Sequence, residues 1–290
     1  MRAAILSKRT HKKSRGPSST LRRNVKTMII QSLRSFFTPL ALARVALALL
    51  LAPDLGHCET VFESPKESVR LVELFTSEGC NSCPPADAWL SSLRTSDGLW
   101  SRYVPVAFHV TYWDSLAWRD RFGLRKFDSL HETTAASANA PVYTPGVFVA
   151  GREWRAWRYA PLAIAAPLDS IVGIVKAEVG DASTNVSFDS PKALTQLSVD
   201  LAWLQANQTT QVRHGENAGK SLHHEFVARA LYSVPMQLRD GVWRASVPTL
   251  ASDRSAAQAV AIWVVDGAGQ PVQATGGWLR SNSDDAAHLP

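Results

Sequence analysis

The sequence predicts an α/β fold over residues 68–180, followed by a smaller β-rich region over residues 185–280. Two observations lead to this prediction. In the first region, apolar segments of strand length alternate with segments whose apolar residues recur at helical spacing, an order typical of sheets with crossover helices. In the second region, short segments rich in β-branched and aromatic residues are separated by turn residues.

Six elements are expected in the first region, in the order strand, helix, strand, helix, strand, helix. Pro84 and Pro85 suit the first turn of the first helix. A backbone N–H in this turn has no acceptor within the helix, so proline loses nothing by lacking one. The second strand is almost continuously apolar, as strands of parallel sheets are. In the second helix, Phe122, Phe127 and Leu130 are candidate core residues. The expected elements span residues 69–76, 86–93, 103–110, 119–139, 146–151 and 163–179.

The β-rich region is expected either to form a small sandwich or to dock its strands on the first domain. Asp240-Gly241 and Asp266-Gly-Ala-Gly269 are turn signals that separate the strands. Strands are expected at residues 186–188, 197–204, 226–233, 241–247 and 259–265.

Residues 1–58 are expected to be a signal or targeting segment. They carry a net charge of +10 against +6 for the whole chain, so residues 59–290 carry −4, which gives no support to nucleic-acid binding. The apolar stretch at residues 40–52 is shorter than the roughly 20 residues of a membrane-spanning helix. The alternatives are a membrane anchor and a lipid attached to Cys58. We expect a periplasmic or secreted protein without a stable membrane span after cleavage.

The cysteines point to redox chemistry. Cys80-Asn-Ser-Cys83 lies between a predicted strand and a predicted helix, where unpaired N–H groups and the helix dipole lower the pKa of a thiol. Two intervening residues allow the second thiol to attack a mixed disulfide formed by the first. Cys80 is therefore the expected nucleophile and Cys83 the resolving thiol. A metal site and a passive disulfide are the alternatives.

Thr144-Pro145 precedes a short predicted strand. In thioredoxin-like folds a cis-proline lies beside the cysteine pair, and the residue before it offers backbone groups to an extended substrate. X-Pro is the bond at which the cis form costs little. The Thr144-Pro145 pair and the cysteine pair together predict a thioredoxin-like domain over residues 68–180.

Four motifs carry a resemblance to a known family: VELFTSEGCNSCPPAD at residues 72–87, FHVTYWD at 108–114, VYTP at 142–145 and GENAG at 215–219. With these motifs the sequence resembles the DUF1223 family, secreted thioredoxin-like proteins of unknown function. The resemblance covers about residues 68–280 and implies a thioredoxin-like fold and export, but no substrate. The family usually carries an acidic residue at the position of Thr111.

Several other side chains are candidates for the site. His109 ends a predicted central strand, at the edge where open α/β sheets have their functional crevice, and could lower the Cys80 pKa or move a proton. Glu73 interrupts an apolar strand and could accept the proton of the resolving thiol. The alternatives are a hydrogen-bonded core histidine and a glutamate at a wet edge. Asp87 is expected to be a surface charge, and residues 215–219 a turn against the active face.

Metal binding is the alternative chemistry. Cys80, Cys83 and His109 could bind Cu(I), although a structural zinc site would need a fourth ligand that is not evident. His223 and His224 are neighbours on a predicted strand, so they point to opposite faces and are expected to be solvated. No cofactor other than a redox-active disulfide is expected.

The sequence therefore predicts an exported thiol–disulfide oxidoreductase acting on a protein or a small-molecule thiol or disulfide. Thr144 and Pro145 would shape the substrate groove, and Trp154, Trp157 and Tyr159 line either this groove or a core. The alternative function is a copper-binding protein or a non-catalytic thioredoxin-fold binding module. No stretch of sequence fixes whether the pair would act as reductase, oxidase or isomerase.

Overall fold

Strand β2 (Arg70–Thr76) runs into a tight turn that carries the cysteines, and helix α2 (Pro84–Ser92) follows directly. The computed structural model describes residues 60–115, 117–159 and 170–279, so the predicted signal segment lies outside the described residues. The two prolines occupy the first two helical positions, as predicted. A short 3-10 turn, η1 (Leu93–Thr95), ends the helix and leads toward β3 (Tyr103–His109).

The second helix is shorter than predicted. Helix α3 spans Arg125–Ser137, whereas the sequence predicted a helix from residue 119. Asp120 prevents the earlier start, because its carboxylate accepts the backbone N–H of Phe122 and closes a turn there. Phe122 and Phe127 are buried and Leu130 is half-buried against the core, as expected.

The predicted helix at residues 163–179 is wrong over residues 170–179, none of which is helical. Residues 160–169 lie outside the described residues, and Ile174–Val179 form strand β6. In this strand Val175, Ala177 and Val179 are buried while the residues between them are more exposed, which is a period of two. Hydrogen bonds to β1 and β7 on either side favour the strand over the helix.

Most of the remaining chain is β-structure. The predicted strands appear as β4, β7, β8, β11, β13 and β14, each within about three residues of its expected limits. The bounds of these strands and of the elements not predicted are β1 (Thr60–Glu63), β4 (Gly146–Val149), β5 (Arg152–Glu153), η2 (Arg155–Arg158), β7 (Ser183–Asp189), β8 (Ser198–Gln205), β9 (Gln208–Gln211), β10 (Ser221–His224), β11 (Val227–Pro235), β12 (Gln237–Arg239), β13 (Val242–Pro248), α4 (Ala251–Ala256), β14 (Ala259–Val265) and β15 (Pro271–Trp278).

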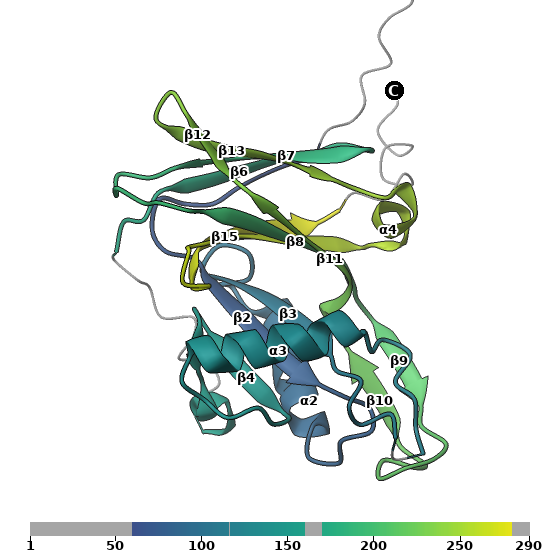
Figure 1. The fold of residues 1–290 in the computed structure, drawn as a ribbon. Coiled ribbons are helices and arrows are strands. Elements are labelled where there is room, and N and C mark those ends of the chain that lie inside the picture. Colours follow the sequence, from purple (N-terminus) through teal and green to yellow (C-terminus); the bar gives the residue numbers. More distant parts are fainter. Residues whose placement is uncertain (1–59, 116, 160–169, 280–290) are drawn as a thin grey trace, which may run out of the picture. The chain divides into compact units, whose positions relative to one another are not determined.

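The strands form two large sheets and one hairpin. The eight-stranded sheet has the order β15-β14-β8-β11-β3-β2-β4-β5, and its strands are both parallel and antiparallel. The five-stranded sheet has the order β1-β6-β7-β13-β12, and β9 and β10 form the hairpin. The described part of the chain thus consists of mixed sheets with few helices and is mostly β (Figure 1).

Strands from both predicted regions share the eight-stranded sheet. β11 pairs with β3 in parallel, with Val227 opposite Ala107, and connects β2, β3 and β4 to β8, β14 and β15. The expected boundary at residues 180–185 falls between β6 and β7, which are neighbours in the five-stranded sheet. Of the two arrangements expected for the later strands, docking on the first region describes the structure.

Two buried clusters stabilise this arrangement. The first surrounds β2, β3 and β4 and contains Phe75, Phe108 and Phe127, with α2 and α3 packed against it. The second lies between the five-stranded sheet and strands β8 and β14, around Phe188 and Trp203. Apolar burial of this kind is the main favourable term in folding.

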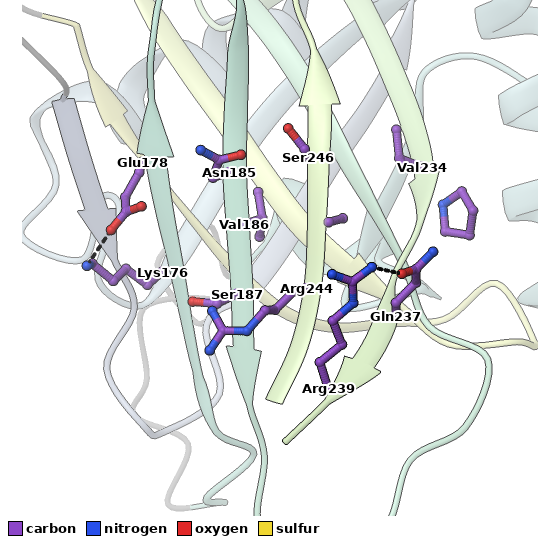
Figure 2. Close-up of a pocket in the computed structure, with 12 residues that line it drawn as sticks. Lys176, Glu178, Asn185, Val186, Ser187, Val234, Gln237, Arg239, Arg244 and Ser246 are labelled. Atoms are coloured by element: carbon purple, nitrogen blue, oxygen red, sulfur yellow. Dashed lines mark hydrogen bonds and ion pairs between the residues drawn. The ribbon is translucent and has the colours of Figure 1, made fainter. Parts of the chain in front are cut away.

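The other face of the five-stranded sheet is polar. A hollow of about 660 Å³ lies over β6, β7, β12 and β13, and Lys176, Glu178, Arg239 and Arg244 point into it (Figure 2). Lys176 pairs with Glu178 at 2.6 Å. None of the cysteines or their neighbours lines this hollow, so the sheet face is separate from the site described next.

Candidate functional site

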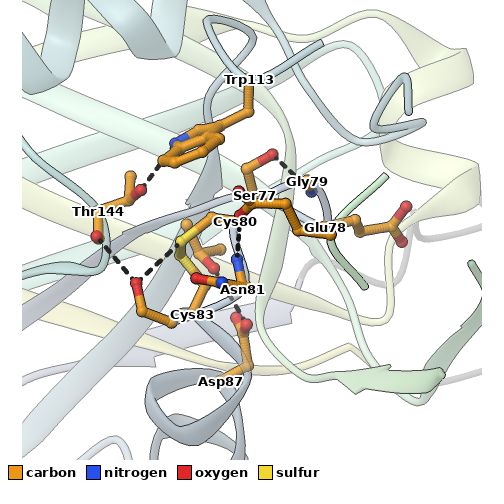
Figure 3. The surroundings of a disulfide bond; sticks show 12 residues. Ser77, Glu78, Gly79, Cys80, Asn81, Cys83, Asp87, Trp113 and Thr144 are labelled. Atoms are coloured by element: carbon orange, nitrogen blue, oxygen red, sulfur yellow. Dashed lines mark hydrogen bonds between the residues drawn. A yellow bond between two sulfur atoms is a disulfide. The ribbon is translucent and has the colours of Figure 1, made fainter. Parts of the chain in front are cut away.

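The cysteine pair lies where β2 ends and α2 begins, as predicted. Cys80 and Cys83 form a disulfide, with Cα atoms 5.4 Å apart, and Cys83 is the residue that precedes the helix (Figure 3). Its carbonyl accepts the backbone N–H groups of Ala86 and Asp87, which is the first turn of α2. The sulfurs therefore face the end of the helix where the dipole favours a thiolate.

Both cysteines are completely buried, although their predicted roles as nucleophile and resolving thiol require sulfurs that an outside thiol can reach. Asn81 and Ser82 between them are exposed, so the turn reaches the surface while its sulfurs do not. Ser82 Oγ lies 3.4 Å from Cys80 Sγ and 3.5 Å from the Thr144 carbonyl oxygen. Exchange with an outside thiol requires the groups around the pair to move.

Thr144 and Pro145 lie beside the cysteine turn. The Thr144–Pro145 peptide bond is cis, which confirms the prediction. Trp113 Nε1 donates a hydrogen bond to Thr144 Oγ1 at 2.8 Å, and Trp113 packs against Gly79, where an added Cβ would meet the Trp113 Cβ at 3.1 Å. Trp113 and Thr144 thus form one wall over the disulfide (Figure 3).

The loop at residues 215–219 forms a second wall, in agreement with its expected position. Asn217 is completely buried although it belongs to a loop between β9 and β10. Its Nδ2 donates to the carbonyl oxygens of Glu78 and Cys80, both at 2.9 Å, and its Oδ1 accepts from Lys220 Nζ at 2.8 Å. The Asn217 amide nitrogen therefore holds the cysteine turn in place, while its oxygen bonds to Lys220 near the same loop.

His109 belongs to a buried group of charges beneath the turn. Its Nδ1 lies 2.7 Å from Asp120 Oδ2, and the same carboxylate oxygen accepts the backbone N–H of Glu78 at 2.8 Å. Burial alone would raise the pKa of Asp120, but His109 and the backbone N–H groups of Glu78 and Phe122 lower it. No hydrogen bond joins His109 to either sulfur within the described residues. The alternative of a hydrogen-bonded buried histidine describes its position.

His224 is buried in the same group, which corrects its expected solvation. Its Nε2 lies 3.5 Å from Glu78 Oε1 and its Nδ1 lies 3.7 Å from Asp87 Oδ1. Burial disfavours its charged form, but these two carboxylates raise the pKa of His224 to about 10. His223 points away and is about half exposed, so the two neighbours do face opposite sides as predicted.

Asp87 is also buried, with 6% of its surface exposed, so its predicted role as a surface charge is wrong. Its Oδ2 accepts a hydrogen bond from Thr76 Oγ1 at 3.0 Å, because α2 packs the carboxylate against the end of β2. Alternation along β2 puts Thr76 on the face that α2 covers. The helix start therefore carries a buried carboxylate as well as the disulfide.

Glu73 lies on the opposite face of β2 from Thr76, since they are three positions apart and an odd spacing puts side chains on opposite faces of a strand. It is buried and lines a cavity of about 410 Å³ together with Asp200 of β8 and Leu130 of α3. Burial and the charge of Asp200 raise the pKa of Glu73 to about 8, and burial raises the pKa of Asp200 to about 6. Glu73 therefore does not lie at a solvent-exposed edge of the sheet, and it lies on the other face of β2 from the Asp87 carboxylate. Its position does not support its predicted role at the resolving thiol.

A groove of about 710 Å³ starts at Ser82 and follows the outer side of α2. Trp89, Pro85 and Trp157 form its apolar floor, and the rings of Trp89 and Trp157 have centroids 6.1 Å apart. Of the predicted aromatic group, Trp157 lines this groove, Trp154 packs on the core, and Tyr159 is exposed. An elongated apolar ligand could reach the cysteine turn through this groove.

Two comparisons with known proteins bear on this site. The DUF1223 family, described as a protein family of unknown function, matches residues 71–265. The chain belongs to the DUF1223 family. The match includes the cysteine turn, His109, the Thr144–Pro145 bond and the loop at residues 215–219, which the structure brings together.

Two solved structures resemble this DUF1223 protein in fold. One is the crystal structure of protein AGR_C_4864 from Agrobacterium tumefaciens, with 20% identity, a TM-score of 0.53, and coverage of 75% of this chain and 97% of that chain. The other is HBP35 of Porphyromonas gingivalis, with 15% identity, a TM-score of 0.54, and coverage of 74% and 76%. No curated protein matches the chain. Among the described residues, none of the helices is both long and apolar enough to cross a membrane.

The sequence analysis missed several residues that lie close to the disulfide in space but far from it along the chain. Asp120 and Asn217 were not singled out, and the burial of Asp87 and His224 was not expected. Asp87 lies in the predicted first turn of a helix, and Asn217 lies in a glycine-bounded loop. Neither position carries a local sequence signal of burial. Only the packing of β10 against α2 and of the loop against the turn makes these side chains part of the site.

Proposed function

We propose that this DUF1223 protein is an exported thiol–disulfide oxidoreductase built on a thioredoxin-like core. The observation that carries the proposal is the position of the Cys80–Cys83 pair at the start of α2, beside the Thr144 carbonyl. The succession β2, α2, β3, α3, β4, β5, with sheet order β3-β2-β4-β5, supports the thioredoxin-like core. In that core β3 is parallel to β2, and β4 is antiparallel to it.

The reduced form would act by two exchange steps. The Cys80 thiolate attacks one sulfur of a substrate disulfide, which forms a mixed disulfide and releases a substrate thiolate. The Cys83 thiolate then attacks Cys80 Sγ, which forms the Cys80–Cys83 disulfide and releases the second substrate thiol. Two electrons pass from the protein to the substrate, and a partner dithiol would return them. The reverse sequence would oxidise a substrate dithiol.

The burial of both sulfurs makes this chemistry conditional on an opening step. The groups that must move are the Trp113–Thr144 wall and the loop of Asn217, which are held by side-chain hydrogen bonds rather than by a sheet. The groove at Ser82, with Trp89 and Trp157 in its floor, is the proposed approach for an extended protein segment. A partner that occupies this groove would lie against the exposed side of the cysteine turn.

A second function is favoured by the same burial. A disulfide with no exposed surface that is enclosed by polar contacts also suits a non-catalytic binding module, in which the bond only fixes the start of α2. The Cu(I) alternative through Cys80, Cys83 and His109 requires prior reduction, because both sulfurs are bonded to each other. Thiol trapping separates the catalytic from the non-catalytic function.

In a Cys58→Ser background, Cys83→Ser should accumulate mixed disulfides with protein or small-molecule thiols, because the resolving step is removed. The matched Cys80→Ser variant should accumulate at least about tenfold less, since the remaining sulfur is the resolving one. Non-reducing electrophoresis with mass spectrometry of the adducts measures both. Equal, background levels of adduct in the two variants would favour the non-catalytic module.

A further inference from the structure

The buried polar group beneath the cysteine turn has the composition of a metal site. Ligand atoms of Asp87, His109 and His224 all lie within 4.8 Å of one another, and each of the three residues is buried. Imidazole nitrogens and a carboxylate oxygen are the usual ligands of Zn²⁺ outside thiolate sites. Ligand atoms around a tetrahedral ion with bonds of about 2.1 Å are roughly 3.4 Å apart, so a small contraction of this group would be enough.

Two of the three side chains are held by hydrogen bonds through their other polar atom, and the third faces a carboxylate. His109 is held through Nδ1 by Asp120, at 2.7 Å. Asp87 is held through Oδ2 by Thr76, and His224 Nε2 faces Glu78 Oε1 at 3.5 Å. A carboxylate on the remote nitrogen of a histidine is the usual second contact of a zinc-bound imidazole, because it fixes the ring and its tautomer.

Among the described residues, two nitrogen atoms of this group are buried without hydrogen-bond partners and belong to residues whose ligand atoms lie close together. Within the described part of the chain, His109 Nε2 and His224 Nδ1 are buried and have no hydrogen-bond partner, although His109 is completely and His224 almost completely inaccessible. Since Asp120 can only accept, His109 Nδ1 carries the proton, and a neutral His109 has its lone pair on Nε2. Buried polar atoms without partners are costly, so an ion between them would supply the missing contacts.

The charges in this volume point the same way. Glu78, Asp87 and Asp120 are buried carboxylates, whereas the group contains two imidazoles. A divalent ion would bring two positive charges to these three buried carboxylates. The contacts at 3.5 and 3.7 Å around His224 are too long for strong hydrogen bonds.

A route for the ion also exists. A pocket of about 380 Å³ lies between α2 and β10, and Asp87 and His224 are among the residues that line it, together with exposed Ala88 and His223. An ion that entered there would reach the carboxylate and the first imidazole before His109. This pocket and the groove at Ser82 lie on different sides of α2 and share only Ala88 among their lining residues.

We propose that Asp87, His109 and His224 bind one divalent transition-metal ion, of the class of Zn²⁺, beneath the disulfide. Three protein ligands leave a fourth position for water or for another donor. The site needs no thiolate, so it differs from a site made by the cysteines and is available while the disulfide is intact. Binding would join β3, α2 and β10 through one ion and is independent of whether the cysteine pair exchanges with thiols.

The test titrates the oxidised full chain, prepared without a histidine tag, with Co²⁺ and with Zn²⁺. One equivalent of Co²⁺ should give visible d–d bands without a thiolate charge-transfer band, and Zn²⁺ should displace it. Asp87→Asn and His224→Gln should each weaken binding at least about 100-fold, and Glu78→Gln about 10- to 100-fold. His214→Gln, which changes an exposed histidine that lines neither the group nor its entry pocket, should bind as the unchanged chain does.

Circular dichroism of each variant checks that it folds. If His224→Gln does not fold, binding by the isosteric variant Asp87→Asn decides the test. Failure of the unchanged chain to bind either ion would overturn the proposal, and the group would then be a protonated His224 between two carboxylates. Undiminished binding by a folded Asp87→Asn, or a thiolate charge-transfer band, would also overturn it, because either result puts the ion elsewhere.

Discussion

Replacing Asn217 with alanine should speed reduction of the Cys80–Cys83 disulfide by dithiothreitol about 10- to 30-fold. The wild-type amide donates to the carbonyl oxygens of Glu78 and Cys80, and both bonds are buried. Each such bond contributes about 1 kcal/mol net, and 1.4 kcal/mol corresponds to a tenfold change in an equilibrium. If reduction proceeds through local opening of the cover, its rate follows the opening equilibrium.

The same substitution should lower the free energy of unfolding by about 1–3 kcal/mol, because two buried carbonyls lose their donor. His214→Ala is the matched control, since His214 is exposed in the same loop. Alkylation followed by mass spectrometry gives the reduction rate, and urea denaturation gives the stability. An unchanged reduction rate in a destabilised Asn217→Ala variant would mean that the loop does not control access to the sulfurs.

Glu73→Gln should make the protein more stable at pH 8, by up to about 4 kcal/mol. Burial and the nearby Asp200 raise the pKa of Glu73 from an ordinary 4.5 to about 8. Below pH 4.5 the carboxyl is protonated in both the folded and the unfolded chain and has no effect on the pH dependence. Between pH 4.5 and 8 the unfolded chain releases this proton and the folded chain keeps it, so stability falls as the pH rises.

The variant cannot ionise at this position, so its stability should fall less steeply over this range. Urea denaturation of both chains at several pH values between 4.5 and 9 measures the difference, which should be small at the acid end and largest at the alkaline end. Glu132→Gln, in the exposed part of α3, is the control for loss of one carboxyl. Parallel curves for the wild type and Glu73→Gln would contradict the account of this buried carboxyl pair.

The sequence predicted the strands and the start of α2 well where local and tertiary preferences agree. The apolar run of β3 is buried at every position, and the two prolines begin α2 as expected. It failed where tertiary contacts decide. Ile174–Val179 has residues compatible with either a helix or a strand, and pairing with β1 and β7 selects the strand. Which strands of the two regions become neighbours, as β3 and β11 do, is not encoded in any local pattern.

For the site, the sequence predicted the cysteine turn, the cis bond at Pro145 and the position of the loop at residues 215–219. It did not predict burial of the sulfurs, because the covering residues come from separate segments, and the contact of Asn217 with Cys80 spans 137 positions of the chain. His224 was expected to be solvated for the same reason: only the packing of β10 on α2 encloses it. Alternation along a strand separates two neighbours but does not say which face is buried.

The central claim is that Cys80 and Cys83 exchange electrons with outside thiols from within the folded protein. Equilibration of the native chain with glutathione and dithiothreitol buffers, with both cysteines quantified by alkylation, tests it most directly. We predict a reversible two-electron transition with a midpoint above about −300 mV while near-UV circular dichroism stays native. A pair that remains oxidised in these buffers, and is reduced only once denaturant unfolds the chain, would contradict the claim.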